Sequence, residues 1–140
     1  MHLKIIRDDQ WLSQRLQFLW TSYFKDVKEL NPIIIKFGRN SRLRLGSIRF
    51  DRRTKTSHIR ITSIFKNPKI PQSVVDHTIA HELIHYAHGF SSSRIRLHKY
   101  PHAGGVVRNE MRERGMEYLY LSYKQWIKQY RLALRRANGW

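Results

Sequence analysis

The chain has 140 residues, enough for one domain with a hydrophobic core of its own. It has no cysteine, which excludes a disulfide framework and a thiolate zinc site, so any metal would be held by histidine and carboxylate. Its 27 Lys+Arg against 10 Asp+Glu give a formal net charge of +17, which favours a polyanionic partner, nucleic acid before anionic membrane. The plainer alternative is a charge that only keeps the protein in solution.

No apolar run approaches the ~18–20 residues of a membrane span, and no hydrophobic signal-peptide region follows Met1. We therefore expect a cytoplasmic protein without a membrane partner, associated with the nucleoid if its partner is DNA. The sequence contains no linker, low-complexity segment or internal repeat, which predicts a single domain over residues 1–140. It does not indicate an oligomeric state.

Residues 9–29 carry apolar side chains at helical spacing and predict a first helix that packs on the core. These side chains are Leu12, Leu16, Leu19, Trp20 and Tyr23. Trp20 and Tyr23 are also of the type that stacks on nucleic-acid bases, but a core position is the favoured interpretation.

Three β-rich runs between residues 33 and 65 predict a small sheet. In the second run the apolar positions shift phase around Gly46 and Ser47, as a β-bulge would produce. The third run, around residues 58–64, places Ile59 and Ile61 on one face. Tight loops between the runs predict a mainly antiparallel, three-stranded sheet packed with helices, which is an α+β fold.

The sheet region is strongly basic. Residues 39–60 contain eight Lys/Arg against Asp51 alone, and residues 52–56 predict the tip of a hairpin. Such a face can follow a phosphate backbone, or it can be a charged edge that discourages aggregation. The candidate nucleic-acid contacts here are Arg42, Arg44, Arg49, Arg52, Arg53, Lys55 and Arg60.

Residues 73–88 predict an amphipathic helix. Ser73 and Asp76 match a capping box, and Gly89 suits a left-handed cap at the other end. The apolar stripe of this helix consists of Val75, Ile79, Leu83 and Tyr86. The roughly opposite stripe consists of His77, His81, His85 and His88. A helix with a core face and a histidine face indicates a metal site.

Within this helix, His81, Glu82 and His85 form an HExxH pattern. Histidines four residues apart lie one above the other, so both imidazoles can reach one ion at about 2.0–2.1 Å. Glu82 lies beside the metal without being needed to bind it, and it can take a proton from water and hand it to a leaving amine. The bare pattern also occurs by chance on solvated helices, but the core stripe and the later histidines favour a metal site.

A third ligand is expected after the helix. His102 is the preferred candidate, because Pro101 restricts the backbone before it and two glycines after it allow close approach to a metal. His88 lies on the same helix as the first two ligands, and one straight helix cannot surround an ion. His98 lies in a basic loop. Three protein ligands would leave an open, catalytic type of zinc site.

Residues 104–137 predict the C-terminal helices, the last of them over residues 117–137. Basic side chains recur every three or four positions on the last helix, with no acid after Glu117. They are candidate nucleic-acid contacts or a solvated face: Lys124, Lys128, Arg131 and Arg135.

The segments HELIHYAHG and PHAGG…RNEMRERG, preceded by a basic β-region, resemble the SprT-like zinc metalloprotease domain, over roughly residues 43–115. The resemblance implies a zincin-like HExxH active-site helix, zinc ligands at His81, His85 and His102, and a catalytic Glu82. The family includes Spartan-type proteases that degrade proteins crosslinked to DNA. No cysteine-rich zinc ribbon is present, so DNA contact is expected from the basic surface of the domain itself.

These features predict a zinc-dependent endopeptidase that acts on nucleic-acid-associated or DNA-crosslinked proteins, with single-stranded DNA as the favoured nucleic acid. The substrate strand is expected to pair with an exposed edge of the sheet. One alternative is a gluzincin-type peptidase with a specific protein substrate and a carboxylate third ligand, at Glu110, Glu113 or Glu117. The other is a non-catalytic, basic nucleic-acid-binding protein.

Overall fold

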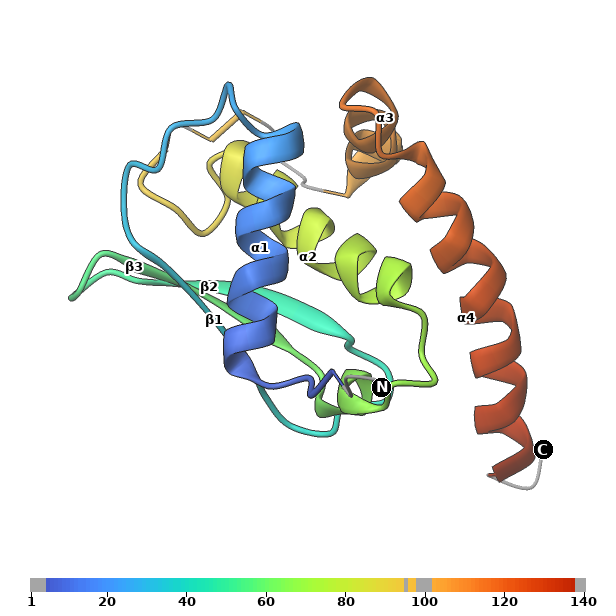
Figure 1. The fold of residues 1–140 in the computed structure, drawn as a ribbon. Coiled ribbons are helices and arrows are strands. Elements are labelled where there is room, and N and C mark those ends of the chain that lie inside the picture. The colour runs from blue at the N-terminus through green and yellow to red at the C-terminus, as the bar shows by residue number, and fades with distance from the viewer. Residues whose placement is uncertain (1–4, 95, 98–101, 138–140) are drawn as a thin grey trace.

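The computed structural model describes residues 5–94, 96–97 and 102–137. This part of the chain forms an α+β fold, a three-stranded mixed sheet with four helices (Figure 1). In chain order the elements are α1 (Asp9–Tyr23), β1 (Ile33–Phe37), β2 (Gly46–Asp51), β3 (Thr56–Ile61), α2 (Gln72–Ala87), α3 (Val106–Glu113) and α4 (Glu117–Ala137). Short 3-10 helices lie at Ser63–Lys66 and Ala103–Gly105.

The sheet has the order β1-β3-β2, with β1 parallel and β2 antiparallel to β3. The prediction of a mainly antiparallel sheet is therefore wrong for β1. The physical reason is burial. Ile59 and Ile61 of β3 are fully buried, and β3 is therefore the central strand of the sheet. The chain after β1 must then reach the far edge of β3 before β2 begins.

The predicted β-bulge at Gly46 is absent from the described register, which runs regularly from Gly46 opposite Ile61 to Asp51 opposite Thr56. The phase shift in the sequence instead marks the start of β2, because Leu43 and Leu45 precede the strand. The predicted hairpin tip is confirmed as a turn after β2, where an Asp51 carboxylate oxygen accepts hydrogen bonds from the backbone of residues 53 and 54.

Helix α1 begins after Asp8, whose carboxylate accepts a hydrogen bond from the Trp11 backbone N–H (2.8 Å). The helix ends at Tyr23, earlier than the predicted residue 29, because Phe24 leaves helical geometry (φ −126°) and its side chain is buried in the core. The predicted apolar positions do face the core: Leu12 and Leu19 are buried, and Leu16, Trp20 and Tyr23 are partly buried against them.

Helix α2 contacts α1, α3, α4 and the sheet, and is buried on most of its surface as a result (Figure 1). The predicted capping box is wrong: the helix starts after Pro71 without a side-chain cap, and Asp76 instead binds Arg15 through two hydrogen bonds of 2.8 and 3.0 Å. Gly89 has the predicted left-handed conformation (φ 77°).

The C-terminal region also matches the predicted helices, although a left-handed Gly115 (φ 84°) divides it into α3 and α4. Helix α4 has the predicted bounds and packs on α2 through the buried Leu119 and Ile127. Within the described residues, no helix is both long and apolar enough to cross a membrane.

The two faces of the sheet differ in chemistry. Ile35, Ile48, Ile59 and Ile61 are buried on the face that meets the helices. The alternate positions are polar, basic or exposed, and cross-strand register aligns them in two rows. One row is Ile34, His58 and Arg49, and the other is Lys36, Arg60 and Ser47.

Candidate metal centre

The HExxH histidines lie one turn apart on α2, with their Nε2 atoms 3.0 Å from each other. His102 precedes the 3-10 helix at Ala103–Gly105, on a separate segment of the chain. Its Nε2 atom lies 2.9 Å from that of His85 and 3.3 Å from that of His81. The structure thus brings three imidazole nitrogens from two segments to one point.

This triangle of nitrogens fits a metal ion. Nitrogens arranged tetrahedrally around an ion at about 2.0–2.1 Å are held about 3.3 Å apart. Without an ion the three short contacts conflict, because each Nε2 either carries a proton or offers a lone pair, so at least two of the three atoms are alike. A cation resolves this conflict by accepting all three lone pairs.

The two α2 histidines are held neutral, as metal ligands must be. Burial is the main cause in both cases, and neighbouring histidines add to it. It lowers the pKa of His81 to about 4 and the pKa of His85 to about 3. Neutral imidazoles suit several transition metals, zinc, copper, nickel and iron among them.

Glu82 lies between the two histidines in sequence and is 5% exposed. Burial raises the pKa of its carboxyl group to about 7, and the nearby positive charge of Arg44 opposes that rise. A carboxyl group with a pKa near neutrality is suited to both accepting and giving a proton at physiological pH.

Gly46 makes room for this carboxylate, a role that sequence reasoning missed. A Cβ atom at Gly46 would lie 2.6 Å from the Thr78 methyl group and 3.4 Å from Oε1 of Glu82. Such a contact to Thr78 is too short to exist without movement of the strand or the helix. The absence of a side chain at Gly46 therefore lets β2 approach α2 at the site.

A cleft of about 390 Å³ opens over Glu82 and the three histidines. One wall is the segment 42–48, which includes the start of the edge strand β2, and the other is α4. The Tyr130 hydroxyl of α4 donates a hydrogen bond to the backbone carbonyl of Arg42 (2.6 Å) and joins the two walls. The site is thus open to a ligand about as large as a short peptide.

The other predicted histidines lie outside the triangle. His77 is buried and stacks on Tyr123 with ring centroids 4.1 Å apart, so it helps to build the cleft wall. Nε2 of His88 lies 3.2 Å from Oε1 of Glu110. His98 lies outside the described residues.

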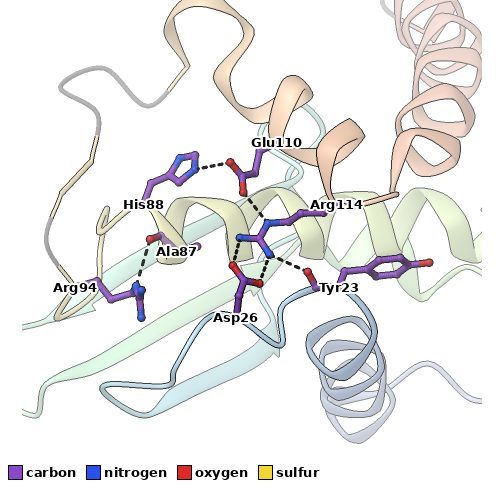
Figure 2. A network of polar contacts seen from close by, with 7 residues as sticks. All are labelled: Tyr23, Asp26, Ala87, His88, Arg94, Glu110 and Arg114. Carbon is purple, nitrogen blue, oxygen red and sulfur yellow. Dashed lines mark hydrogen bonds and ion pairs between the residues drawn. The ribbon is translucent and has the colours of Figure 1, made fainter.

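Glu110 belongs to a polar network that fixes α3 (Figure 2). Its carboxylate contacts His88 at the end of α2 and Arg114 (2.7 Å) one turn along α3. Arg114 also donates two hydrogen bonds to Asp26 (2.7 and 3.0 Å) and one to the Tyr23 carbonyl oxygen (2.8 Å). The network ties α3, which follows His102, to the end of α2 and the exit of α1.

The structure does not place a glutamate where the alternative third ligand, a carboxylate, would be needed; among the described residues the site has three histidines. Among the described residues, the cluster of possible metal-ligand atoms from His, Asp and Glu side chains consists of His81, His85 and His102. Glu110 is engaged in the network, and Glu113 and Glu117 are exposed elsewhere on α3 and α4.

The eleven predicted basic contact residues fall into three groups. Arg42, Arg44 and Arg131 line the cleft. A second group lies on the face of the sheet away from the helices and in the turn after β2: Arg49, Arg60, Arg52, Arg53 and Lys55, joined by Lys36, which was not predicted. A third group is exposed on α4: Lys124, Lys128 and Arg135.

No protein-family model matches the chain, and no curated protein or solved structure shows significant similarity to it. A functional assignment therefore depends on the chemistry of the site.

Proposed function

We propose that the protein is a zinc-dependent endopeptidase in which His81, His85 and His102 hold the ion and Glu82 is the general base. The observation that supports this most directly is the triangle of Nε2 atoms, 2.9–3.3 Å apart, beside a buried carboxylate in an open cleft. Three protein ligands are the usual number in catalytic zinc sites, which keep a position for water. The short motifs shared with SprT-like proteases support the same assignment.

The chemistry divides between the ion and the chain. Zinc, when bound, supplies Lewis acidity that polarises a peptide carbonyl and acidifies water. Glu82 takes a proton from that water and later delivers it to the leaving amine. The two α2 histidines stay neutral and keep their lone pairs for the ion.

The substrate backbone pairs with β2, the edge strand whose first residues line the cleft. Main-chain hydrogen bonds to a strand edge hold an extended peptide without reading each side chain. This geometry suits an enzyme that cuts many different proteins, such as those bound or crosslinked to DNA in the cytoplasm and nucleoid.

The proposed binding surface for nucleic acid is the sheet face away from the helices. Strand register places Lys36 beside Arg60 there, Arg49 lies in the neighbouring row, and the turn after β2 adds three more cations. A row of cations with spacing set by a sheet can follow a single-stranded phosphate backbone. On α4, Lys124, Lys128 and Arg135 share a helix face with the cleft residue Arg131, so this second basic surface continues from the cleft.

Metal dependence tests this proposal. Digestion of denatured casein is compared for the zinc-loaded protein, the chelated protein and the His102→Ala variant. We expect cleavage only by the zinc-loaded wild type, restored to the chelated protein by zinc. Undiminished cleavage after complete removal of zinc would refute the proposal, and zinc binding without cleavage of free or DNA-bound protein would favour a binding protein.

A further inference from the structure

The cleft carries an excess of positive charge. Arg42 and Arg44 line it from the segment before β2, and Arg131 lines it from α4. Among the described lining residues, the single carboxylate is that of Glu82, the proposed base. Tyr130, which precedes Arg131, donates a hydrogen bond to the Arg42 carbonyl oxygen, so the two walls that carry these arginines are in contact.

These charges are available to a ligand. Within the described part of the chain, the arginines that form ion pairs with acids are Arg15 and Arg114. None of the three cleft arginines forms such a pair with a described acid. Arg44 also lies near enough to Glu82 for its charge to act on that carboxylate, so a substrate group that meets Arg44 lies close to the reacting atoms.

Apolar side chains also line the cleft. Leu43, between the two arginines of the segment before β2, is 89% exposed. The other apolar side chains that line the cleft are Leu45, Ile48, Phe90, Ile127 and Leu134. A ligand that matches both features carries negative charge beside apolar surface, and an extended peptide presents such side chains at alternate positions.

We propose that the cleft selects peptide segments in which acidic side chains accompany apolar ones, and that Arg42, Arg44 and Arg131 determine this specificity. The inference rests on the proposed function and narrows its substrate class. A carboxylate accepts strong, charge-assisted hydrogen bonds from guanidinium groups. A neutral peptide covers the same arginines without pairing them, which costs part of their hydration. Acidic segments are therefore bound more tightly than neutral segments of the same length.

The test uses two peptides of equal length, one alternating leucine with glutamate and the other alternating leucine with glutamine. Their affinities are measured on the zinc-loaded Glu82→Gln protein, which needs no turnover, and their kcat/KM values on the zinc-loaded wild type. We expect about a tenfold preference for the glutamate peptide, which corresponds to about 1.4 kcal/mol. Arg44→Gln and Arg131→Gln should each reduce this ratio to about three or less.

The matched control is Lys25→Gln, which removes one exposed charge outside the cleft and should leave the ratio unchanged. Equal affinities for the two peptides would overturn the inference and leave the proposed function standing. A ratio that the arginine variants do not change would also overturn it. If Arg44→Gln weakens binding of an oligothymidylate but leaves the ratio of the two peptide affinities unchanged, the cleft is a nucleic-acid groove instead.

Cleavage tests the proposed peptidase function, and binding tests the proposed preference for acidic segments. A glutamate preference in binding, without cleavage of any peptide by the wild type, would contradict the proposed function and support the specificity. Cleavage of both peptides with the same kcat/KM and the same affinity would support the proposed function and overturn the specificity.

Discussion

Glu82 is a buried carboxyl group, and its burial has a cost to stability. Burial raises its folded-state pKa from an ordinary value of 4.5 to about 7. Between these two values the folded protein holds a proton that the unfolded chain has released, so the free energy of unfolding falls as pH rises through this window. Above pH 7 the folded, metal-free protein carries the full cost of a buried charge.

The first prediction follows from this titration. In the metal-free protein, Glu82→Gln should raise the free energy of unfolding at pH 8 by about 1–3 kcal/mol, because the glutamine cannot ionise. The difference should shrink toward zero near pH 4.5. Urea unfolding of both proteins across this range measures it, and a pH-independent difference would show that the carboxyl group is not buried as described.

Gly46 allows close packing of β2 against α2, which a methyl group at this position should disturb. Gly46→Ala places a methyl group 2.6 Å from the Thr78 side chain and near Glu82, and should destabilise the fold by about 1–3 kcal/mol. Gly38→Ala is the matched control, since its Cβ meets only the flexible Arg60 side chain at 3.5 Å or more. Equal unfolding midpoints for the two variants would contradict the close approach of β2 to α2.

The sequence was informative about individual residues where a fixed spacing carries the chemistry. His81, Glu82 and His85 lie four residues apart or less, so helix geometry alone places them together. His102 was selected by its flanking Pro101 and glycines, and the structure brings it to the other two histidines. Gly46 was misread as part of a bulge, because the side chain that requires it, Thr78, lies far along the chain.

Among the elements, α3 is held by a few polar contacts that are partly buried or exposed. Arg114 binds Glu110, Asp26 and the Tyr23 carbonyl oxygen at 2.7–3.0 Å, and its side chain is 13% exposed. The network therefore ties α3, which follows His102 in the chain, to the end of α2 (Figure 2).

Arg114→Ala should lower the free energy of unfolding by about 2–4 kcal/mol, because Glu110, which is partly buried, then keeps only its His88 contact within the network. It should also weaken zinc binding, because His102 is then less firmly placed. Arg112→Ala is the control on the same helix, where an exposed side chain makes only a 3.5 Å contact to Asn109. Chemical unfolding and a competitive zinc titration measure both effects, and two variants with equal zinc affinity would exclude a role in placing His102.

Helix positions were predictable from the sequence because amphipathic spacing and left-handed glycines are local signals. The bounds of α4 agree with residues 117–137, and Gly89 follows α2 as expected. Strand order was not predictable in this way. Alternation shows which side chains face the core, but the central place of β3 depends on its burial under α2, which follows it in the chain.

The whole molecule carries a charge of +17, and the fold distributes it unevenly. Arginines in the cleft face the proposed peptide substrate, whereas the outer sheet face and its turn form a separate basic surface. The composition predicted a polyanionic partner, but only the fold separates these surfaces, since Arg44 and Arg49 are close in sequence and lie in different places.

This division predicts the salt dependence of nucleic-acid binding. Arg49→Gln and Arg60→Gln should each weaken binding of an oligothymidylate and reduce the slope of log K against log[salt] by about 0.7, the value for one single-strand phosphate contact. Lys25→Gln, which removes the same charge from another surface, should leave the slope unchanged. Fluorescence anisotropy at several salt concentrations measures this, and equal slopes for all variants would place the contact elsewhere.

If Glu82 is the base that activates water beside a three-histidine zinc site, Glu82→Gln removes peptide-bond cleavage and leaves zinc binding intact. Zinc content and cleavage of a DNA-bound protein, with and without single-stranded DNA, are measured for wild type and variant together. We predict that the variant binds zinc as the wild type does and loses cleavage by about a hundredfold or more, the contribution typical of a general base. Full cleavage by a Glu82→Gln protein with normal zinc content would contradict the account.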